Sequence, residues 1–409
     1  MNIETELARH LQRLCVDIGR RPSGSPGNHV AAEYIGRVLR AAGLEVKEQR
    51  YECPAWEHEE TRLEVNGAPI KANANAFSPA CDVTAPTVAV GTVAELQTAD
   101  LNGRIGILYG DLARAPLSPK SWFLKSERDD HIIRLLEEKK PVALITVQAA
   151  TAEFGQVIED WQVGIPSATV LPGEGLALLK QCGASVRLRI KSRQTPGDSC
   201  NVVARTLRAG AGAGRIVLCA HYDTKMDTPG ATDNGGGVAT LLTLAQVLSQ
   251  RKHALGLEFI AFSGEEYMPI GDDEYLRRCE NQFGQIVTAI NMDGVGPYLG
   301  ANSITAMACS QAFHAHVAGV TQKYPGVVWV EPWPESNHST FSFRGVPSLA
   351  LSAVGVRNIA HYPTDTLDQV SPAKLAEVVS LVADIVESLQ DKSIEWCREA
   401  RSSLAAVAV

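Results

Sequence analysis

The sequence predicts an α/β fold, in which a mostly parallel, doubly wound sheet carries helices on both faces and a smaller β-rich domain is inserted. From residue 199 onward, near-continuous apolar runs of strand length alternate with helical patterns, as in parallel sheets that are covered on both sides. Residues 68–195 instead contain short strand-like runs separated by proline and glycine turns. The length of 409 residues suits one large domain and one smaller one. We therefore expect residues 1–67 and 196–409 to form the large domain and residues 68–195 the inserted one.

The elements before and within the inserted domain follow from local patterns. Apolar spacing predicts helices over residues 4–18 and 28–42, and the turn formers of residues 21–27 join them. Residues 44–52 alternate between apolar and polar, which predicts a strand, and the charged segment 125–140 is predicted to be helical. The strands expected in the inserted domain cover residues 87–91, 104–110, 142–147, 168–172 and 185–190.

The large domain continues after the insertion in longer strand and helix units. Strands are expected within residues 201–207, 215–224, 257–266, 285–294, 303–308 and 346–353. Helices are expected over residues 236–251, 310–324 and 372–391. The glycine-alanine loop at 210–214 joins two strands and opens no helix, so we interpret it as a hairpin and not as a nucleotide-binding turn.

Charge, hydropathy and cysteine use exclude several classes of partner. A formal net charge of -8 argues against a nucleic-acid partner, which would need clustered Lys and Arg. No apolar run approaches the roughly 18 residues of a membrane span, so no membrane partner is expected. The first residues lack an apolar signal stretch, and the nine cysteines are dispersed without a Cys-x-x-Cys pair. These features are typical of a cytoplasmic protein with reduced thiols. The sequence leaves open whether the chain forms a homo-oligomer.

Acidic and imidazole side chains recur directly after successive predicted strands. In a doubly wound sheet, ligands bind at the carboxyl ends of the strands. The residues found at those ends are His221, Asp223, Asp233, Glu265, Glu266, Asp293, His361 and Asp365. Each alone has an ordinary reading as a helix cap, a turn former or a solvated surface group. Together, buried carboxylates would repel one another unless cations were present. Nitrogen and oxygen ligands of this kind suit zinc, and their number suffices for two ions that share a bridging carboxylate.

Five short motifs in order resemble those of the co-catalytic di-zinc exopeptidase family, whose members include bacterial leucyl aminopeptidases and glutamate carboxypeptidase II. They are HYDT (221–224), PGATDNGGGV (229–238), SGEE (263–266), NMDGVG (291–296) and HYPTDT (361–366). Residues 21–35 also resemble the opening helix region of that family. The inserted region resembles the protease-associated domain of many members, through residues 103–110, 143–147 and 165–179. The resemblance implies a zinc-exopeptidase-like fold with an inserted protease-associated-like domain.

The resemblance also implies a role for each motif residue. His221 and Asp293 would bind one Zn²⁺ ion, Glu266 and His361 the other, and Asp233 would bridge the two. Glu265 would act as general base and then as general acid, because it stays off the metals while its neighbour ligates. The carboxylate of Asp223 would orient His221, and Asp365 could do the same for His361. Two zinc ions per chain would lower the pKa of a shared water and polarise the amide carbonyl.

Two segments depart from the family pattern near the expected substrate site. After Glu266, the family usually has a turn of small residues and a Ser, whereas this chain has Tyr-Met-Pro-Ile-Gly-Asp over residues 267–272. Where the family often has Ser-Asp-His, residues 336–338 are Ser-Asn-His. In the preceding loop, Trp333 could hold an apolar side chain and a nearby Glu a free amino terminus, and His338 could reach the substrate.

These observations favour a zinc-dependent aminopeptidase that hydrolyses N-terminal peptide bonds, with a peptide or small amide as substrate. One alternative is a carboxypeptidase or an amidohydrolase acting on a small non-peptide amide, for which Arg344 and Arg357 are candidate basic anchors. Another is a non-catalytic scaffold protein on the same fold. The scaffold is the less favoured hypothesis, because such a protein should have lost ligands that are all present here.

Overall fold

The structure is a computed structural model that describes residues 2–122, 124, 126–148, 154–206, 214–356 and 359–398. Arg357 and positions 210–213 of the predicted hairpin loop lie outside the described residues. Contacts divide the chain into two compact units: unit 1 comprises Met1–Cys53 and Asp198–Val409, and unit 2 comprises Pro54–Gly197. The chain passes between the units within two long strands, β1 (Glu45–Val65) and β8 (Ser185–Arg205). Among the described residues, no helix has the length and apolar character needed to cross a membrane.

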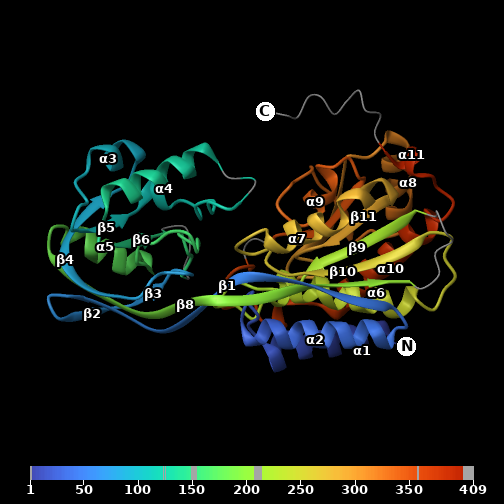
Figure 1. Cartoon of the computed structure of the whole chain (residues 1–409), viewed down its shortest axis with the longest axis horizontal. Coiled ribbons are helices and arrows are strands. Elements are labelled where there is room, and N and C mark those ends of the chain that lie inside the picture. Colours follow the sequence, from blue (N-terminus) through green and yellow to red (C-terminus); the bar gives the residue numbers. More distant parts are fainter. Residues whose placement is uncertain are drawn as a thin grey trace. The chain divides into compact units, whose positions relative to one another are not determined.

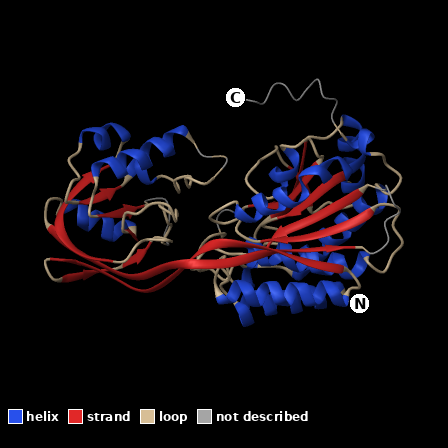
Figure 2. Ribbon diagram, viewed as in Figure 1, coloured by secondary structure: helices blue, strands red, loops and turns tan. Residues whose placement is uncertain are grey.

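Unit 1 contains a mixed sheet with the strand order β13-β12-β14-β11-β9-β10-β8 (Figures 1 and 2). Its strands after β8 are β9 (Arg215–His221), β10 (Gly256–Phe262), β11 (Ile286–Met292), β12 (Ala301–Met307), β13 (Val327–Trp329) and β14 (Ser348–Val354). The pairs β10–β9, β9–β11, β11–β14 and β12–β13 are parallel, whereas β12–β14 and β10–β8 are antiparallel. The predicted mostly parallel α/β fold is confirmed.

Two helices of unit 1 begin with a capping serine that is followed by proline. In α2, Ser25 accepts a hydrogen bond from the backbone N–H of Asn28, and a proline follows in the first turn. In α10, Ser371 caps in the same way and is also followed by proline. The α-helices are α1 (Ile3–Leu11), α2 (Pro26–Ala41), α6 (Gly236–Leu248), α7 (Ile270–Cys279), α8 (Gln311–Thr321), α9 (His338–Ser342), α10 (Pro372–Ser388) and α11 (Ile394–Cys397). The shorter or irregular helices are η1 (Gln12–Ile18), η3 (Ala231–Gly235), η4 (Glu280–Gln285) and η6 (Leu367–Gln369).

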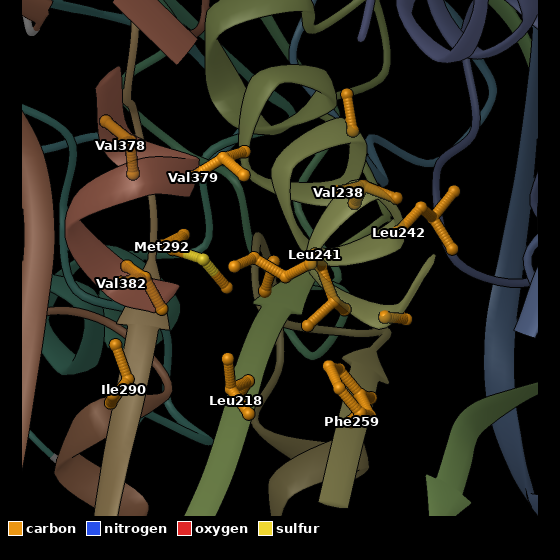
Figure 3. Close-up of a cluster of buried hydrophobic side chains, with 14 of the residues drawn as sticks. Leu218, Val238, Leu241, Leu242, Phe259, Ile290, Met292, Val378, Val379 and Val382 are labelled. Atoms are coloured by element: carbon orange, nitrogen blue, oxygen red, sulfur yellow. The ribbon is translucent and has the colours of Figure 1, made fainter. Parts of the chain in front are cut away.

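The two faces of the unit 1 sheet bury different side chains of the same strands. In β9, Leu218 faces a core formed with α1, α2, α6 and α10, whereas its neighbour Cys219 faces a second core formed with α7 and α9. Figure 1 shows α1 and α2 on one side of the sheet and α7 and α9 on the other. Figure 3 shows Leu218, Phe259 and Ile290 on neighbouring strands, facing α6 and α10. Burial on both faces explains why these strands are apolar at nearly every position.

Unit 2 has its own sheet, with the order β8-β4-β5-β6-β7-β3. Its elements are β2 (Ala68–Ile70), β3 (Ala72–Ala74), β4 (Cys81–Val90), α3 (Val93–Thr98), β5 (Ile105–Leu108), η2 (Gly110–Ala113), α4 (Glu127–Lys139), β6 (Ala143–Val147), β7 (Ser167–Val170) and α5 (Pro172–Lys180). The strands from β4 to β7 pair in parallel, and β8 and β3 pair antiparallel at the two ends of the row. Strands β1 and β2 also form an antiparallel pair. The predicted strand runs and the charged helix of this region are present, and within the described residues the α-helices α3 and α5 and the short helix η2 accompany them.

Several local predictions need correction, among them the helices predicted over 236–251 and 372–391, which end at Leu248 and Ser388. The segment 4–18 is not one α-helix, because the α-helix ends at Leu11 and the chain continues as the π-helical η1. The strand predicted over residues 44–52 continues through Pro54 to Val65, so β1 reaches into unit 2. The helix predicted over 310–324 ends at Thr321, before the turn at Tyr324.

Candidate metal centre

Three adjacent parallel strands deliver the first set of predicted side chains to one edge of the sheet. His221 is the last residue of β9, and Asp293 follows β11 directly. Glu265 and Glu266 come three and four residues after the end of β10, which pairs with β9. Because β10, β9 and β11 run parallel, their carboxyl ends meet at the same edge.

The segment before α6 brings Asp233 to that edge. Gly230 begins this segment with a φ of +57°, and an added Cβ there would lie 2.4 Å from the carbonyl oxygen of Asp233. Only glycine fits this close approach without strain. The peptide bond between Asp233 and Asn234 is cis. The Asn234 side chain donates to the carbonyl of Met292 and accepts from the N–H of Gly237, so it ties the start of α6 to the end of β11.

The Asp233 carboxylate lies between two imidazoles. Its Oδ1 is 3.1 Å from Nε2 of His221, and its Oδ2 is 2.9 Å from Nε2 of His361. Nε2 of His221 also lies 3.4 Å from Oδ1 of Asp293, and Nε2 of His361 lies 3.4 Å from Oε2 of Glu266. The structure therefore brings together the five residues that the motifs suggest as metal ligands.

These side chains form two groups that could each hold a cation. The first is His221, Asp233 and Asp293, and the second is Asp233, Glu266 and His361; within each group the potential ligand atoms all lie within 4.8 Å of one another. Oε1 of Glu266 is buried and has no hydrogen-bond partner among the described residues. A buried carboxylate oxygen without a partner is costly unless a cation satisfies it. The donor set, two imidazoles and three carboxylates with one shared, fits two zinc ions.

The electrostatics of the cluster also favour bound cations. Burial, reinforced by neighbouring carboxylates, raises the pKa of Glu265 and of Glu266 well above the usual value. Burial opposes the charge on His221, but the carboxylates of Asp293 and Glu265 raise its pKa overall. Burial works against the charge of Asp233 as well, yet hydrogen bonds from His221 and His361 lower its pKa. Without cations, the cluster therefore has to retain protons that metal ions would displace.

The carboxylate of Asp223 lies close to the His221 ring and accepts hydrogen bonds from the Glu265–Glu266 turn. Its Oδ1 is 3.6 Å from Nδ1 of His221, the nitrogen on the far side of the ring from the metal cluster. Its two oxygens also accept the backbone N–H groups of Glu265 and Glu266, at 3.3 and 3.2 Å. Gly264, with a φ of +87°, lets the chain turn so that both N–H groups face this carboxylate. Asp223 thus fixes the turn that carries Glu265 and Glu266, and its carboxylate also faces the His221 ring.

Asp365 does not occupy the place expected for it beside His361. Its Oδ1 accepts from the N–H and the hydroxyl of Thr232, at 2.8 and 2.6 Å, and its Oδ2 accepts from the N–H of Asp233 at 3.0 Å. No hydrogen bond joins it to His361 within the part of the chain that the structure describes. The physical reason is that Asp365 is fully buried and satisfies backbone donors, whereas the His361 side chain is half exposed. Burial raises the pKa of Asp365 to about 6.

The loop before α9 contacts the centre through a residue that sequence reasoning did not select. The hydroxyl of Ser336 donates to Oδ2 of Asp293 at 2.6 Å, and the side-chain amide of Asn291 donates to Ser336 Oγ at 2.8 Å. Nearby, Nε2 of His338 donates to the carbonyl of Trp333 at 2.6 Å, and their rings meet edge to face. His338 is fully buried, so its contacts are internal. The sequence shows both the motif around Ser336 and the acidic residue Asp293, but it does not indicate that their side chains form a hydrogen bond.

Two buried, positively charged side chains near the metal centre, Arg21 and Lys225, are not indicated by the sequence. The Arg21 guanidinium donates to the carbonyls of Tyr222, Pro229 and Gly230, at 2.7, 2.6 and 2.8 Å, and so anchors the segment that leads to Asp233. The Lys225 ammonium donates to the Glu266 carbonyl at 2.7 Å and lies 3.9 Å from its Oε2. Arg21 lies in the segment 21–35 that resembles the family, but nothing in the local pattern of that segment indicates these contacts.

Arg344, a candidate basic anchor for the substrate, contacts residues outside the metal cluster. Arg344 donates to the carbonyl of Thr340 at 3.1 Å, and its guanidinium lies over the ring of Phe283 at 5.7 Å. No ion pair joins it to the carboxylates of the metal cluster among the described residues.

Comparison with known sequences identifies similar proteins. Residues 201–386 match a family described as Peptidase family M28. Aminopeptidase YwaD of Bacillus subtilis (strain 168) is 28% identical over 315 residues, which are 72% of this chain and 64% of that protein. The probable lipoprotein aminopeptidase LpqL of Mycobacterium tuberculosis (strain ATCC 25618 / H37Rv) is 26% identical over 274 residues, or 64% of this chain and 52% of that protein. The aligned part of the chain thus spans between half and two thirds of the length of these curated relatives.

Comparison with solved structures shows the same fold. An aminopeptidase from Aneurinibacillus sp. strain AM-1 has a TM-score of 0.75 at 24% identity, and the match covers 97% of this chain and 94% of that one. BSAP, a zinc aminopeptidase from Bacillus subtilis, has a TM-score of 0.78 at 21% identity, with 97% of this chain and 98% of that one covered.

Proposed function

We propose that this chain, whose residues 201–386 match the family described as Peptidase family M28, is a zinc-dependent aminopeptidase that releases N-terminal residues from peptides. The observation that carries the proposal is the Asp233 carboxylate, which is shared by two three-residue ligand groups. The names of the relatives support the aminopeptidase assignment, since both curated proteins described above are called aminopeptidases.

His221 and Asp293 would hold one zinc ion, Glu266 and His361 the other, and Asp233 would contribute to both. Bound zinc would lower the pKa of a water and polarise the carbonyl of the scissile peptide bond. Two of the five side chains, His221 and Glu266, are almost completely buried, whereas His361 is half exposed, so the site would be open to solvent on the His361 side. The Lys225 ammonium beside Glu266 offsets part of the negative charge that remains.

Glu265 would be the general base and acid. It belongs to neither ligand group, and its carboxylate lies 3.9 Å from Nε2 of His221. Its side chain is 14% exposed, whereas that of Glu266 is 2% exposed, so Glu265 stands on the side that water and substrate reach. It can therefore take a proton from the attacking water and deliver it to the leaving amine.

Trp333 would contact the apolar side chain of the substrate's N-terminal residue. It lies half-buried in the same loop as Ser336, which holds the ligand Asp293. The buried His338 would fix the conformation of this loop through its hydrogen bond to the Trp333 carbonyl. This division of roles gives Trp333 the substrate contact and His338 a supporting one.

We further infer that unit 2 is a protease-associated-like domain and that the protein works in a reducing compartment such as the cytoplasm. The first inference is supported by the motif resemblance of residues 103–110 and 165–179, which contribute to β5, β7 and α5. The second is supported by the nine cysteines, none of which forms a disulfide.

The first experiment combines metal analysis with a substrate panel. The purified protein is analysed for metals by mass spectrometry and offered dipeptides that are free, N-acetylated or C-amidated. We expect about two zinc ions per chain, with cleavage of the free and amidated peptides and none of the acetylated ones. Zinc without cleavage of any peptide would contradict the aminopeptidase and favour a small non-peptide amide as substrate. Neither zinc nor turnover would favour a non-catalytic scaffold.

A further inference from the structure

A buried carboxylate that the proposed mechanism does not use lies behind the metal centre. Asp272, in the first turn of α7, is 7% exposed. Nδ2 of Asn337 donates to both of its oxygens, at 3.1 and 2.9 Å, and the hydroxyl of Thr340 donates to its Oδ1. These hydrogen bonds satisfy a charge that burial would otherwise disfavour.

This pair lies one residue from a direct contact with a ligand. Asn337 follows Ser336, whose hydroxyl donates to Oδ2 of Asp293. The other oxygen of Asp293, Oδ1, is the one that lies 3.4 Å from Nε2 of His221. Ser336 thus occupies one oxygen of the ligand and leaves the other turned toward the cation site.

The two members of the pair lie in the two segments that depart from the family pattern. The segment 267–272 ends with a carboxylate, and position 337 has an amide in place of a carboxylate. A carboxylate at both positions would place two buried negative charges against each other, and the amide at position 337 avoids this repulsion. Together the two departures form one hydrogen-bonded pair through Nδ2 of Asn337, while Oδ1 of Asn337 is buried without a hydrogen-bond partner among the described residues.

We propose that Asp272 is a positioning residue for the metal ligand Asp293, acting through Asn337 and Ser336. The Asp272 carboxylate fixes Asn337 against α7, and this fixes the adjacent Ser336 hydroxyl on Oδ2 of Asp293. Losing the anchor lets Ser336 leave, and Asp293 then rotates away from the cation. The proposal rests on the proposed function, since it takes Asp293 as a zinc ligand.

The test is a reciprocal exchange read out by zinc affinity. The full-length protein and the variants D272N, N337D and D272N/N337D are stripped of metal and titrated with Zn²⁺ against a chromophoric chelator. The matched control is D273N, which changes the neighbouring, exposed carboxylate of the same helix. Each single variant should bind zinc about 10- to 100-fold more weakly, the range found for residues that orient ligands. The double variant restores an amide facing a carboxylate and should recover most of the loss, and D273N should match the wild type.

Thermal unfolding of the metal-free proteins separates positioning from general stability. Single variants that unfold at lower temperature but bind zinc as the wild type does would overturn the proposal, as would a folded double variant that recovers nothing. If D272N does not fold, T340V removes one hydrogen bond to Asp272 and should still weaken zinc binding several-fold; unchanged affinity would overturn the proposal. A wild-type protein that binds no zinc would reject both this proposal and the proposed function. Zinc binding without peptide cleavage would reject only the aminopeptidase activity, and the variants would still decide the role of Asp272.

Discussion

Oδ2 of Asp365 accepts a hydrogen bond from the backbone N–H of Asp233 at 3.0 Å, across 132 positions in the sequence. The other oxygen of Asp365 accepts a hydrogen bond from the N–H of Thr232, so one buried side chain fixes two consecutive peptide groups. His361, four residues before Asp365, is itself 2.9 Å from the Asp233 carboxylate. A single loop therefore supplies one of the proposed metal ligands and also holds the segment that carries the proposed shared ligand, Asp233.

Replacing Asp365 should weaken metal binding although this residue touches no metal. In D365A the N–H groups of Thr232 and Asp233 lose their buried acceptor, so Asp233 is no longer held in place. We expect zinc affinity to fall about 10- to 100-fold, measured by competition with a chelator. The nearby exposed Asp368 provides the control variant D368N, which should behave as the wild type. Equal zinc affinity in D365A and D368N would refute this role.

Removing the carboxylate of Glu265 should separate catalysis from metal binding. E265Q keeps the size of the side chain and can no longer take up a proton, so turnover should fall about 10²- to 10⁴-fold. Metal content by mass spectrometry should stay at the wild-type level, because Glu265 belongs to neither ligand group. Wild-type turnover in E265Q would exclude it as the base.

Asp233→Ala should have the opposite signature. Its carboxylate lies between His221 and His361 and belongs to both ligand groups, so its loss weakens both cation positions at once. We expect both ions to be depleted after purification, with loss of thermal stabilisation by added zinc. Retention of two ions per chain in D233A would show that Asp233 does not bridge them.

A buried ion network away from the site should dominate the stability of unit 1. Oε2 of Glu258, in β10, lies 3.1 Å from Nε of Arg205 and 2.6 Å from Nε of Arg215, and its Oε1 accepts from the Tyr275 hydroxyl. E258A leaves two guanidinium groups without their carboxylate and should cost about 3–5 kcal/mol of unfolding free energy. The comparison variant is E387A, which breaks an exposed pair with Arg251 and should cost less than about 1 kcal/mol. Denaturant unfolding of both variants measures the difference, and equal losses would contradict the prediction.

Stability should also depend on pH through His10. Burial, reinforced by the charge of Arg9, lowers the pKa of His10 to about 4, and its Nδ1 lies 2.7 Å from the Tyr34 hydroxyl. Because the unfolded chain has the higher pKa for this group, it binds more protons between about pH 6.5 and pH 4, and stability falls as the pH falls through that range. Full charging of the unfolded state corresponds to about 3 kcal/mol. In H10Q this contribution is absent, so urea unfolding midpoints at pH 7.5 and pH 5 should differ less than in the wild type.

The sequence is informative wherever a property is local or periodic. The apolar runs of β9, β10 and β11 are visible because both faces of these strands are buried, and the rule that ligands gather at strand ends places His221 and Asp293 together. The helix predicted over residues 28–42 is found as α2, and its start lies two residues earlier because Ser25 caps it.

The sequence is uninformative where a contact joins distant segments. Nothing near Asp365 indicates that its acceptors would meet the N–H groups of Thr232 and Asp233, and nothing near Arg21 indicates the carbonyls of residues 229–230. The end of β1 was placed too early because its polar residues after Cys53 hide the strand pattern, although the backbone stays extended to Val65.

Unit 1 is assembled from two stretches of chain that unit 2 separates. Leu7 and Leu11 of α1 share a core with Val378 and Val382 of α10, and Arg21 bonds to Gly230 across 209 positions. During synthesis α1 and α2 emerge before α6 and α10, so their apolar faces meet these helices only after unit 2 has followed. Contacts of such long range slow folding and leave hydrophobic surface exposed meanwhile. Unit 2 is continuous in sequence and all of it precedes His361, so contacts within the insertion can form before the last of the proposed ligands is synthesised.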